Sequence, residues 1–372
     1  MNMTFTCPYC YEEHKILECG MKCAYMIKET NSTCFRGVVK KDDWIPDEEK
    51  KQCLKCTHSR KRIFCTNIGK EIPTGFLFGK SLPIAMIGAK STGKSNYIAV
   101  VINEIRKNLI KRFNATLDLG CSEESKKYYD EHYYSHIYKN SRAITYATNL
   151  NGAPPMIFPL RFMDSKNRVT KVATLTFYDS AGESFNRDED VLIYDRYIPN
   201  SKGIILLLDP LQVPSVRKKL EGKMDLPPQN TETAEVLSRV VQTIRDVNNN
   251  HRKQIDIPLA LAFTKMDALE RFDVLPPDSS LRCESMHMER GAFVISDFEN
   301  TNIEMSALLE NWLDAELLQM VKNFKQYSLF GLSALGTIPA KDGSIGEVRP
   351  KRVLDPLLWL LAENSFISKV KN

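Results

Sequence analysis

The chain has 372 residues, of which 43% are hydrophobic, and a formal net charge of +5. This length and apolar content suit one large folded domain with a small one beside it, and they exclude a mainly disordered chain. The longest apolar run, residues 203–211, is interrupted at Asp209 and is far shorter than the ~20 residues needed to span a bilayer. We therefore expect a soluble, cytoplasmic protein without a membrane segment.

Cysteines are concentrated at the start of the chain, where eight of the ten occur before residue 66. In a reducing cytosol such clustering indicates metal binding and argues against disulfides. The same segment is rich in Lys and Arg, which is typical of a nucleic-acid surface. Two zinc ions with four thiolates each would offset that positive charge, so we give the basic balance little weight. We expect residues 1–72 to form a zinc-binding module and residues 73–82 to form a linker.

The cysteine spacing predicts two zinc ions. The pairs CPYC and CLKC have the two intervening residues that let both sulfurs reach one tetrahedral ion. In sequence order the two sets would be Cys7, Cys10, Cys19 and Cys23, followed by Cys34, Cys53, Cys56 and Cys65. An interleaved pairing is equally allowed by the spacing, and His14 and His58 are further candidate ligands.

The remaining residues, 83–372, alternate between apolar strand patterns and helical patterns. We expect a strand over 84–87, a helix over 93–113, a tyrosine-rich helix over 122–140 and a hairpin formed by 156–163 and 169–179. Further strands are expected over 203–209, 257–264 and 328–333, and further helices over 231–247, 302–324 and 352–366. The segment 213–230 reads as a mobile loop. This order predicts an α/β fold with a mainly parallel sheet covered by helices on both faces.

The sequence GAKSTGKS, residues 88–95, has the spacing of a phosphate-binding loop and lies between the first of these strands and a helix. Gly88 and Gly93 let successive backbone N–H groups converge on phosphate oxygens at a helix N-terminus. Lys94 adds a charge for the outer phosphates, and the Ser95 hydroxyl can ligate Mg²⁺. The other residues expected to line the nucleotide here are Ala89, Lys90, Ser91, Thr92 and Asn96.

Three further elements follow later strands. In DSAGE, Asp179 can hold Mg²⁺ through a water, and Gly182 offers an N–H to a terminal phosphate. In TKMD, Asp267 can accept both the ring N–H and the exocyclic amine of guanine, which adenine cannot match. Thr264 and Lys265 belong to the same element. In the fourth, Ser333, Ala334 and Leu335, backbone N–H groups could meet the guanine carbonyl oxygen.

These four elements, in this order, resemble the signature of Ras-like, translation-factor-related P-loop GTPases. The cysteine pairs ahead of the domain, LLLDP and the C-terminal RVLDPLLWLL resemble bacterial double-GTPase family domains of the same clade. The resemblance implies GTP and GDP binding, GTP hydrolysis with Lys94, Asp179, Gly182 and Glu183 in catalytic roles, and a place in a multi-component conflict or antiviral defence system.

Some positions depart from the GTPase pattern. Thr264 replaces the usual Asn, and Glu183 stands where Ras-like proteins carry the water-orienting Gln. A carboxylate there could orient water but adds negative charge beside the γ-phosphate, so we expect slow basal hydrolysis. For the Thr that the first switch contributes to Mg²⁺, both Thr145 and Thr148 qualify, and Thr148 is preferred.

Three functions fit these features. The first is a GTP-hydrolysing switch whose zinc module and switch regions dock a protein partner. The second is a nucleotide-dependent nucleic-acid binder that uses the zinc module and the tyrosine-rich helix. The third is a GTP-binding scaffold that never hydrolyses its nucleotide. We favour the first.

Overall fold

The computed structural model describes most of the chain apart from its cysteine-rich segment and several loops. The described residues are 4–7, 9–10, 12–16, 19–23, 61–72, 82–88, 92–117, 123–145, 156–177, 197–229, 233–248, 253–312 and 315–371.

Four parallel strands form the centre of the larger domain. They are β6 (Ile84–Gly88), β10 (Gly203–Leu208), β11 (Leu259–Phe263) and β13 (Tyr327–Gly331), in the spatial order β13-β11-β10-β6. Leu206 lies level with Ile87 on one side and with Leu261 on the other, and Leu261 is level with Leu329. Because the strands are parallel and in step, their carboxyl ends meet at one edge of the sheet, where such folds bind ligands.

An antiparallel sheet adjoins this core on the β6 side. It contains β7 (Ala115–Leu117), β8 (Met156–Met163) and β9 (Val169–Phe177). The last two form the expected hairpin, while the short β7 was not predicted. The buried hydroxyl of Tyr197 lies against the carbonyl oxygens of Ile84 in β6 and Thr176 in β9, so one side chain joins the two sheets.

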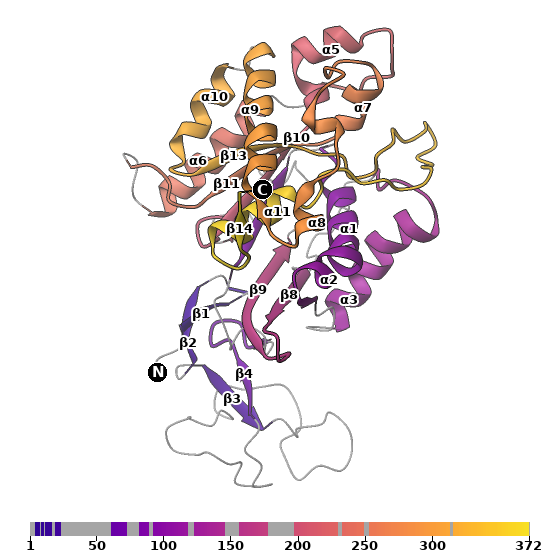
Figure 1. Cartoon of the computed structure of the whole chain (residues 1–372). Helices are drawn as coiled ribbons and strands as arrows, with labels where there is room; N and C mark the ends of the chain where they lie inside the picture. The colour runs from indigo at the N-terminus through magenta and orange to yellow at the C-terminus, as the bar shows by residue number, and fades with distance from the viewer. Residues whose placement is uncertain are drawn as a thin grey trace.

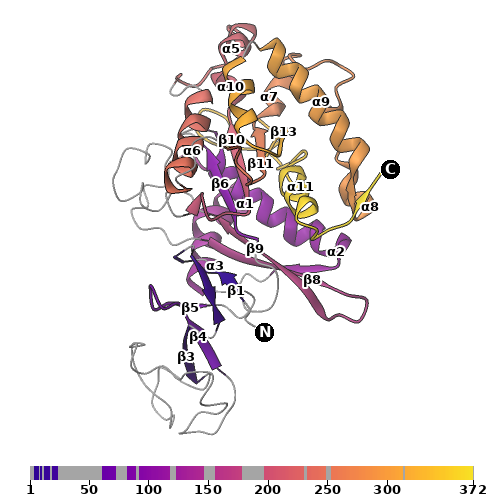
Figure 2. The ribbon, with the colours of Figure 1, turned by 90° about the vertical axis from the view of Figure 1, so that its left-hand side faces the viewer.

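Helices cover both faces of the central sheet, as expected. Alternate side chains of a strand point to opposite faces; Ile84 and Met86 enter one hydrophobic core, and Ala85 and Ile87 enter another. The first core is closed by α1 (Lys94–Glu104) and α11 (Asp355–Glu363). The second is closed by α5 (Pro214–Leu220), α6 (Thr233–Asn248), α9 (Ile295–Asn311) and α10 (Ala315–Met320). In Figure 2, α6 lies to the left of β10 and α11 to its right.

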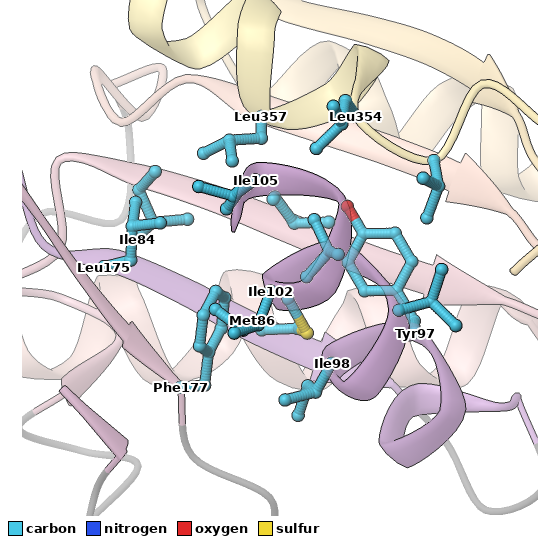
Figure 3. Close-up of a cluster of buried hydrophobic side chains, with 14 of the residues drawn as sticks. Ile84, Met86, Tyr97, Ile98, Ile102, Ile105, Leu175, Phe177, Leu354 and Leu357 are labelled. Carbon is cyan, nitrogen blue, oxygen red and sulfur yellow. The ribbon is translucent and has the colours of Figure 1, made fainter. Parts of the chain in front are cut away.

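Figure 3 shows how the first core is assembled around α1. Ile98 and Ile102 of α1 lie beside Met86 of β6 and Phe177 of β9, and Leu357 of α11 covers the opposite side. The helix that follows the phosphate loop is therefore held between the sheet and the C-terminal helix. Since every one of these side chains is nearly or fully buried, the position of α1 is fixed by packing.

Several helices differ from the prediction in their bounds. The helix expected over 93–113 exists, but it passes through a π-helical stretch, Ile105–Leu109, before α2 (Ile110–Arg112). The tyrosine-rich helix consists of α3 (Glu123–Tyr129) and a π-helical continuation, Asp130–Lys139. Tyr129 and Tyr133 are fully buried, and the Tyr129 hydroxyl donates to the carbonyl of Ala99 in α1 at 2.9 Å. These tyrosines therefore pack and are unable to stack nucleic-acid bases.

Two expectations about helical segments were wrong. The segment 213–230 was expected to be a mobile loop, but it contains α5, which begins with Pro214 and buries Val216 and Leu220. Proline suits the first turn of a helix, where its missing N–H costs nothing. The single helix expected over 302–324 is instead α9, which starts seven residues earlier, and α10.

The larger domain also contains several short helices, strands and helical turns. They are α7 (Met266–Arg271), α8 (Met286–Arg290), β12 (Phe293–Val294), β14 (Lys369–Val370) and the single helical turns Pro210–Gln212, Ser280–Arg282 and Val321–Asn323.

The outer side of β13 is covered at one point by a side chain. Asn302 of α9 accepts a hydrogen bond from the backbone N–H of Leu329 at 2.8 Å. β13 is the last strand of the central sheet in the described residues. The amide of an outermost strand is thus satisfied inside the chain.

The N-terminal part forms small antiparallel sheets that lie below β8 and β9 in Figure 1. One pairs β1 (Thr4–Thr6) with β2 (Glu13–Lys15); the other contains β3 (Gly20–Cys23), β4 (Lys61–Phe64) and β5 (Glu71–Ile72). Of the expected linker, 73–82, only Leu82 is described. No helix among the described residues has the length and apolar character that crossing a membrane requires.

Candidate nucleotide site and metal centre

The phosphate-binding loop begins where β6 ends. Gly88 is closely surrounded: a Cβ there would lie 2.7 Å from the Thr92 hydroxyl and 3.3 Å from Leu207. Gly93 directly precedes the first residue of α1. Its φ of 81° is a left-handed conformation that residues other than glycine rarely adopt. The close approach at Gly88 and the left-handed backbone at Gly93 therefore explain why glycine occupies both positions. Ala89, Lys90 and Ser91 lie outside the described residues.

Lys94 and Ser95 form the first turn of α1. Lys94 is buried and Ser95 is half-buried. Their position at a helix N-terminus, directly after the left-handed Gly93, is where backbone N–H groups and the helix dipole favour a phosphate. The phosphate and Mg²⁺ roles expected of these two residues stay predictions.

Thr264 follows β11 and connects it to the phosphate loop. Its hydroxyl donates to the Thr92 carbonyl at 2.7 Å and lies 3.1 Å from the Leu208 carbonyl. Its backbone N–H also donates to Leu208 at 2.9 Å. The residue is 3% exposed, so these bonds are shielded from water. The Thr at this position thus ties the base-reading element to the phosphate loop.

Lys265 adopts a left-handed conformation, with φ 54°, immediately before α7. Its ammonium group lies 2.6 Å from the carboxylate of Asp209, which follows β10 and is almost fully buried. Burial of the Asp209 charge requires a partner, and Lys265, whose side chain is 31% exposed, supplies it. Asp209 was missed as a site residue, although its position directly after an apolar strand was a usable signal.

Asp267 and Ser333 meet at the same edge of the sheet. The Ser333 hydroxyl donates to Oδ1 of Asp267, and the N–H of Gly336 donates to the Ser333 oxygen at 3.3 Å. Burial raises the pKa of Asp267 above its ordinary value, while the bond from Ser333 opposes that rise. Ser333 is itself held by two backbone hydrogen bonds with Lys351, of 2.9 and 3.0 Å. Two elements that lie 66 residues apart are thus brought into contact.

Asn96, which was expected to line the nucleotide, uses its side chain to bond another segment of the chain. Its side chain bonds both backbone groups of Ile144, accepting from the N–H at 2.9 Å and donating to the carbonyl at 3.1 Å. The side chain of Asn96 therefore holds the backbone at Ile144, which precedes the expected first switch. Thr145 is described and exposed, whereas Thr148 lies outside the described residues.

The second switch residues Asp179, Gly182 and Glu183 also lie outside the described residues. Phe177, the last residue of β9, precedes Asp179 by two positions and is buried beside α1. The strand that leads to this element is thus part of the first core.

Four metal-ligating side chains meet in the N-terminal module: Cys7, Cys10, His14 and Cys65, whose ligand atoms all lie within 4.8 Å of one another. The Cys10 and Cys65 sulfurs are 3.6 Å apart, and the Cys65 sulfur is 3.7 Å from Nε2 of His14. Zinc–sulfur bonds of 2.3 Å in a tetrahedron would place sulfurs about 3.8 Å apart. The donor set and spacing therefore fit zinc.

This cluster differs from the set written in sequence order. His14 and Cys65 take the places given to Cys19 and Cys23, so the set is interleaved. Cys19 is buried, but its thiol donates to the Lys15 carbonyl at 3.4 Å. The side chain of Cys23, and all of Cys34, Cys53, Cys56 and His58, lie outside the described part.

The three thiols of the cluster differ in how readily they lose a proton. A hydrogen bond with Cys7 lowers the pKa of Cys10 to about 5 and raises that of Cys7. Burial raises the pKa of Cys65. One thiolate is therefore favoured even without a metal, and zinc would displace the remaining thiol protons.

The small hydrophobic core around the cysteine cluster reaches the larger domain. Cys7, Cys10 and Cys65 belong to a small hydrophobic core that also contains Ile157 of β8. Because β8 lies in the hairpin between the two expected switches, this small core includes a residue of the element that joins them.

Comparisons with known proteins agree with this geometry. The model of the Double-GTPase 2 family matches residues 82–317. A putative ESX-1 scaffolding and assembly protein, SaeC of Mycolicibacterium smegmatis, is 24% identical over 312 residues, which cover 78% of this chain and 76% of that protein.

Two solved structures with some similarity are a small GTPase and a GTPase-like domain. The Arl6 BBS3 small GTPase of Trypanosoma brucei, bound to GppNp, is 13% identical with a TM-score of 0.32, and the match covers 78% of this chain and all of that one. The GTP-bound Ski7 GTPase-like domain of S. cerevisiae is 15% identical with a TM-score of 0.34, and the match covers 77% of this chain and 51% of that one.

Proposed function

The chain belongs to the Double-GTPase 2 family, and from this premise we propose that its P-loop domain binds GTP and GDP with Mg²⁺ and hydrolyses GTP slowly. The observation that carries the base assignment is the contact between Asp267 and Ser333. Ser333 occupies one oxygen of the carboxylate and fixes its orientation. An ionised carboxylate in that position accepts two N–H groups from guanine, whereas adenine offers no matching pair.

The carbonyl oxygen of guanine is recognised by the turn at 333–335. The amide of Ser333 is committed to Lys351, which leaves the amides of Ala334 and Leu335 as candidate donors. Lys265 packs its stem beside the base while Asp209 holds its ammonium group. Fixed donors and acceptors of this kind give selectivity because a wrong base leaves them unpaired.

The phosphates bind at the N-terminus of α1. Lys94 contacts the outer phosphates, and Ser95 ligates Mg²⁺ together with Thr148 and, through water, Asp179. The ion, when bound, neutralises charge on the β- and γ-phosphates during transfer. Ser95 fits because it is half-buried in the first helical turn, directly after the left-handed Gly93.

Hydrolysis depends on residues of the second switch. Glu183 orients the attacking water, and Gly182 donates its N–H to the γ-phosphate. Phosphoryl transfer is loose, so orientation and positive charge matter more than a base. Glu183 supplies orientation but no positive charge, which makes the basal rate slow. Lys90 is a candidate source of that charge, and a partner is another.

The Cys7, Cys10, His14 and Cys65 cluster binds zinc and organises a docking surface for a protein partner. Contact of this core with Ile157 gives a bound partner a physical path to the switch hairpin. SaeC, named for scaffolding and assembly, supports a role with protein partners. The conflict or defence context remains a prediction from the family resemblance.

Two alternative functions, nucleic-acid binding and GTP binding without hydrolysis, can each be tested. A nucleic-acid binder is disfavoured by the burial of Tyr129 and Tyr133, and would show affinity for nucleic acid that falls steeply with salt. A GTP-binding scaffold would bind nucleotide without releasing phosphate in a single-turnover assay.

Calorimetry with Mg²⁺ and purified protein tests the base assignment. GDP and GTP should bind, ADP and ATP should bind at least about 100-fold more weakly, and Asp267→Asn should remove most of this preference. Glu270→Gln, which alters a nearby carboxylate of α7 that pairs with Lys351, is the matched control. Equal affinities of the wild type for ATP and GTP would contradict the proposal.

A further inference from the structure

The turn at 333–335 is held by the segment that leads into α11. The N–H of Ser333 donates to the Lys351 carbonyl at 3.0 Å, and the N–H of Lys351 donates to the Ser333 carbonyl at 2.9 Å. Two residues further along, the N–H of Arg349 donates to the Leu335 carbonyl at 3.0 Å. These bonds form a short antiparallel pairing. One side of it is the turn that we propose to read guanine, and the other side is the segment before α11.

Arg352 follows this pairing directly and has an unusual backbone conformation. Its φ is 53°, in the left-handed region that favours glycine. A residue with a long side chain keeps such a conformation only where its surroundings hold it there. The carbonyl of Lys351 and the N–H of Arg352 belong to one planar peptide unit. Any shift of the Arg352 backbone therefore moves the carbonyl that accepts the hydrogen bond from Ser333.

The guanidinium of Arg352 joins two helices. It donates to both carboxylate oxygens of Asp297 in α9, at 2.9 and 3.0 Å, and to the carboxylate of Asp355, the first residue of α11, at 3.0 Å. All three side chains are buried. Burial alone would raise the pKa of Asp297, but the bonds from Arg352 outweigh it and hold that pKa below its ordinary value. The network is therefore ionised, and removing one member is costly.

The same cluster includes His287 of α8, and the ligand atoms of His287, Asp297 and Asp355 lie within 4.8 Å of one another, as in a metal site. The hydrogen bonds argue against a metal. The N–H of Val294 donates to Nδ1 of His287 at 3.0 Å, so the neutral ring carries its proton on Nε2. Nε2 is the nitrogen that lies 4.0 Å from the Asp297 carboxylate. A protonated nitrogen is unable to ligate a metal, and Arg352 is therefore the cation of this cluster.

We propose that Arg352 is a positioning residue for guanine recognition: its bonds to Asp297 and Asp355 fix the peptide unit that accepts from Ser333, and thereby the backbone N–H groups that meet the guanine carbonyl oxygen. This inference rests on the proposed function. Because two buried carboxylates occupy the guanidinium, Arg352 acts through the backbone of Lys351 and has no need to touch the nucleotide. In Figures 1 and 2, α8, α9 and α11 lie close together, so one residue connects the turn to all of them.

The side chain of Lys351 has a separate and weaker contact. Its ammonium group lies 2.8 and 3.1 Å from the carboxylate oxygens of Glu270 in α7. This pair is 24% and 31% exposed, and partly exposed ion pairs contribute little. The proposal concerns the backbone of Lys351 alone. Glu270→Gln therefore separates the two, since it weakens the ion pair and leaves the backbone pairing intact.

The expected consequence is specific for the base. Guanine carries a carbonyl oxygen where adenine carries an amine, so only guanine accepts a hydrogen bond from the turn. The phosphates bind at α1 in either case. Loosening the turn should therefore weaken GDP and leave ADP nearly unchanged. IDP has the same carbonyl oxygen as GDP and lacks only the exocyclic amine, so it should weaken by the same factor as GDP.

The test compares Arg352→Lys with wild type by calorimetry with Mg²⁺ and GDP, IDP or ADP. Lysine keeps the positive charge and replaces the fork of donors by a single ammonium group. Loss of about one hydrogen bond to the base predicts a fall of about twofold to tenfold for GDP and IDP, with less than about a twofold change for ADP. Glu270→Gln is the matched control and should change none of the three affinities.

Asp297→Asn tests the same network from its other end. The substitution keeps the shape of the side chain and removes the charge that faces Arg352. It lies on α9 and reaches the turn only through Arg352, so it should give the same pattern across the three nucleotides. The double variant Arg352→Lys with Asp297→Asn should lose little more than the more affected single variant, because both changes act on one network.

Equal losses for GDP and ADP, or no loss in either test variant, would overturn the positioning role and leave the proposed function intact. A loss for GDP that IDP escapes would also overturn it, because the amine would then be read in place of the carbonyl. If the wild type shows no preference for GDP over ADP, the proposed function itself fails. Thermal unfolding of each variant defines the temperature range in which it is folded, and all three affinities are measured there on the same sample.

Discussion

The hydroxyl of Thr264 donates a hydrogen bond to the carbonyl oxygen of Thr92 at 2.7 Å. This contact joins the end of β11, where the proposed base-reading element begins, to the proposed phosphate-binding loop, across 172 residues of sequence. The usual residue at this position in Ras-like GTPases is Asn, and the bond explains how Thr can take its place. A hydroxyl on the buried side of the strand end is sufficient to reach the loop.

Thr264→Val should weaken GTP and GDP about equally, by roughly fivefold to thirtyfold, because it removes the hydroxyl that donates to the buried Thr92 carbonyl. The variant keeps the shape of the side chain, so the fold should survive with a loss of about 1–2 kcal/mol in unfolding free energy. Fluorescence titration with labelled nucleotides measures the effect. Thr264→Ser keeps the hydroxyl and should bind nearly as wild type; equal behaviour of the Ser and Val variants would dismiss the bond.

The affinity for GDP should depend on pH through Asp267. Guanine requires the ionised carboxylate. In the free protein, burial raises the pKa of Asp267 above the ordinary 3.8. Below that raised pKa the protein must release a proton to bind, so affinity falls as pH falls, by up to about tenfold per unit. The fall should begin at a higher pH than an ordinary aspartate would cause.

Calorimetry between pH 7 and the acid limit of folding measures this dependence. Asp267→Asn should bind GDP weakly and without the same pH dependence, since its amide does not ionise. A wild-type affinity that stays flat to pH 4 would show that the carboxylate is not used.

Lys94→Ala and Ser95→Ala should each reduce GTP affinity by at least about tenfold without unfolding the protein. Lys94 supplies positive charge to the outer phosphates, and Ser95 supplies a ligand to Mg²⁺. Only Ser95→Ala should also abolish the gain in affinity that Mg²⁺ produces, because Lys94 acts on phosphate. Lys107→Ala, an exposed lysine further along the same helical segment, is the control. Unchanged affinity in both variants would remove this turn from the site.

Zinc content should be close to two ions per chain, and His14→Ala should lower it by about one. The described cluster needs His14 to complete a tetrahedral set with Cys7, Cys10 and Cys65. Cys19→Ser is the control, because Cys19 bonds Lys15 in the described structure. It should retain both ions if Cys23, Cys34, Cys53 and Cys56 form the second set.

Elemental analysis of carefully prepared protein decides between these outcomes. A loss of zinc from Cys19→Ser with full retention in His14→Ala would reverse the assignment and restore the set in sequence order.

GTP turnover should be slow, and Glu183 should control it. Glu183→Gln keeps a group that orients water and should retain substantial activity, whereas Glu183→Ala should lose most of it. Single-turnover phosphate release is the measurement, with GDP affinity as a check that the site is intact. If the alanine variant hydrolyses GTP as fast as wild type, Glu183 does not orient the attacking water. Lys90 or a partner residue would then be the next candidate for that role.

The strand ends from which the expected nucleotide elements start could be predicted from sequence because each strand is an apolar run. Once strands at 84–88, 203–208 and 259–263 are parallel, Gly88, Asp209 and Thr264 must lie at one edge. The sheet with two covered faces followed from the same pattern, and it is confirmed.

Contacts that depend on distant pairing could not be predicted. The bond of Asn96 to Ile144 spans 48 residues, and nothing near residue 96 indicates it. The ligand set that joins His14 to Cys65 spans 51 residues and depends on how two separate hairpins meet. Helix α5 was missed because Pro214, Gly222 and a basic run resemble loop sequence, while burial of Val216 and Leu220 decides in favour of a helix.

The bond between Asn302 and Leu329 has a consequence for assembly. An outermost strand with unsatisfied amides is a template on which another chain can add a strand of its own. Here the side chain of α9 already occupies the amide of Leu329, so at that point an incoming strand finds no donor. At Leu329 the sheet is thus protected from being extended by a strand of another chain.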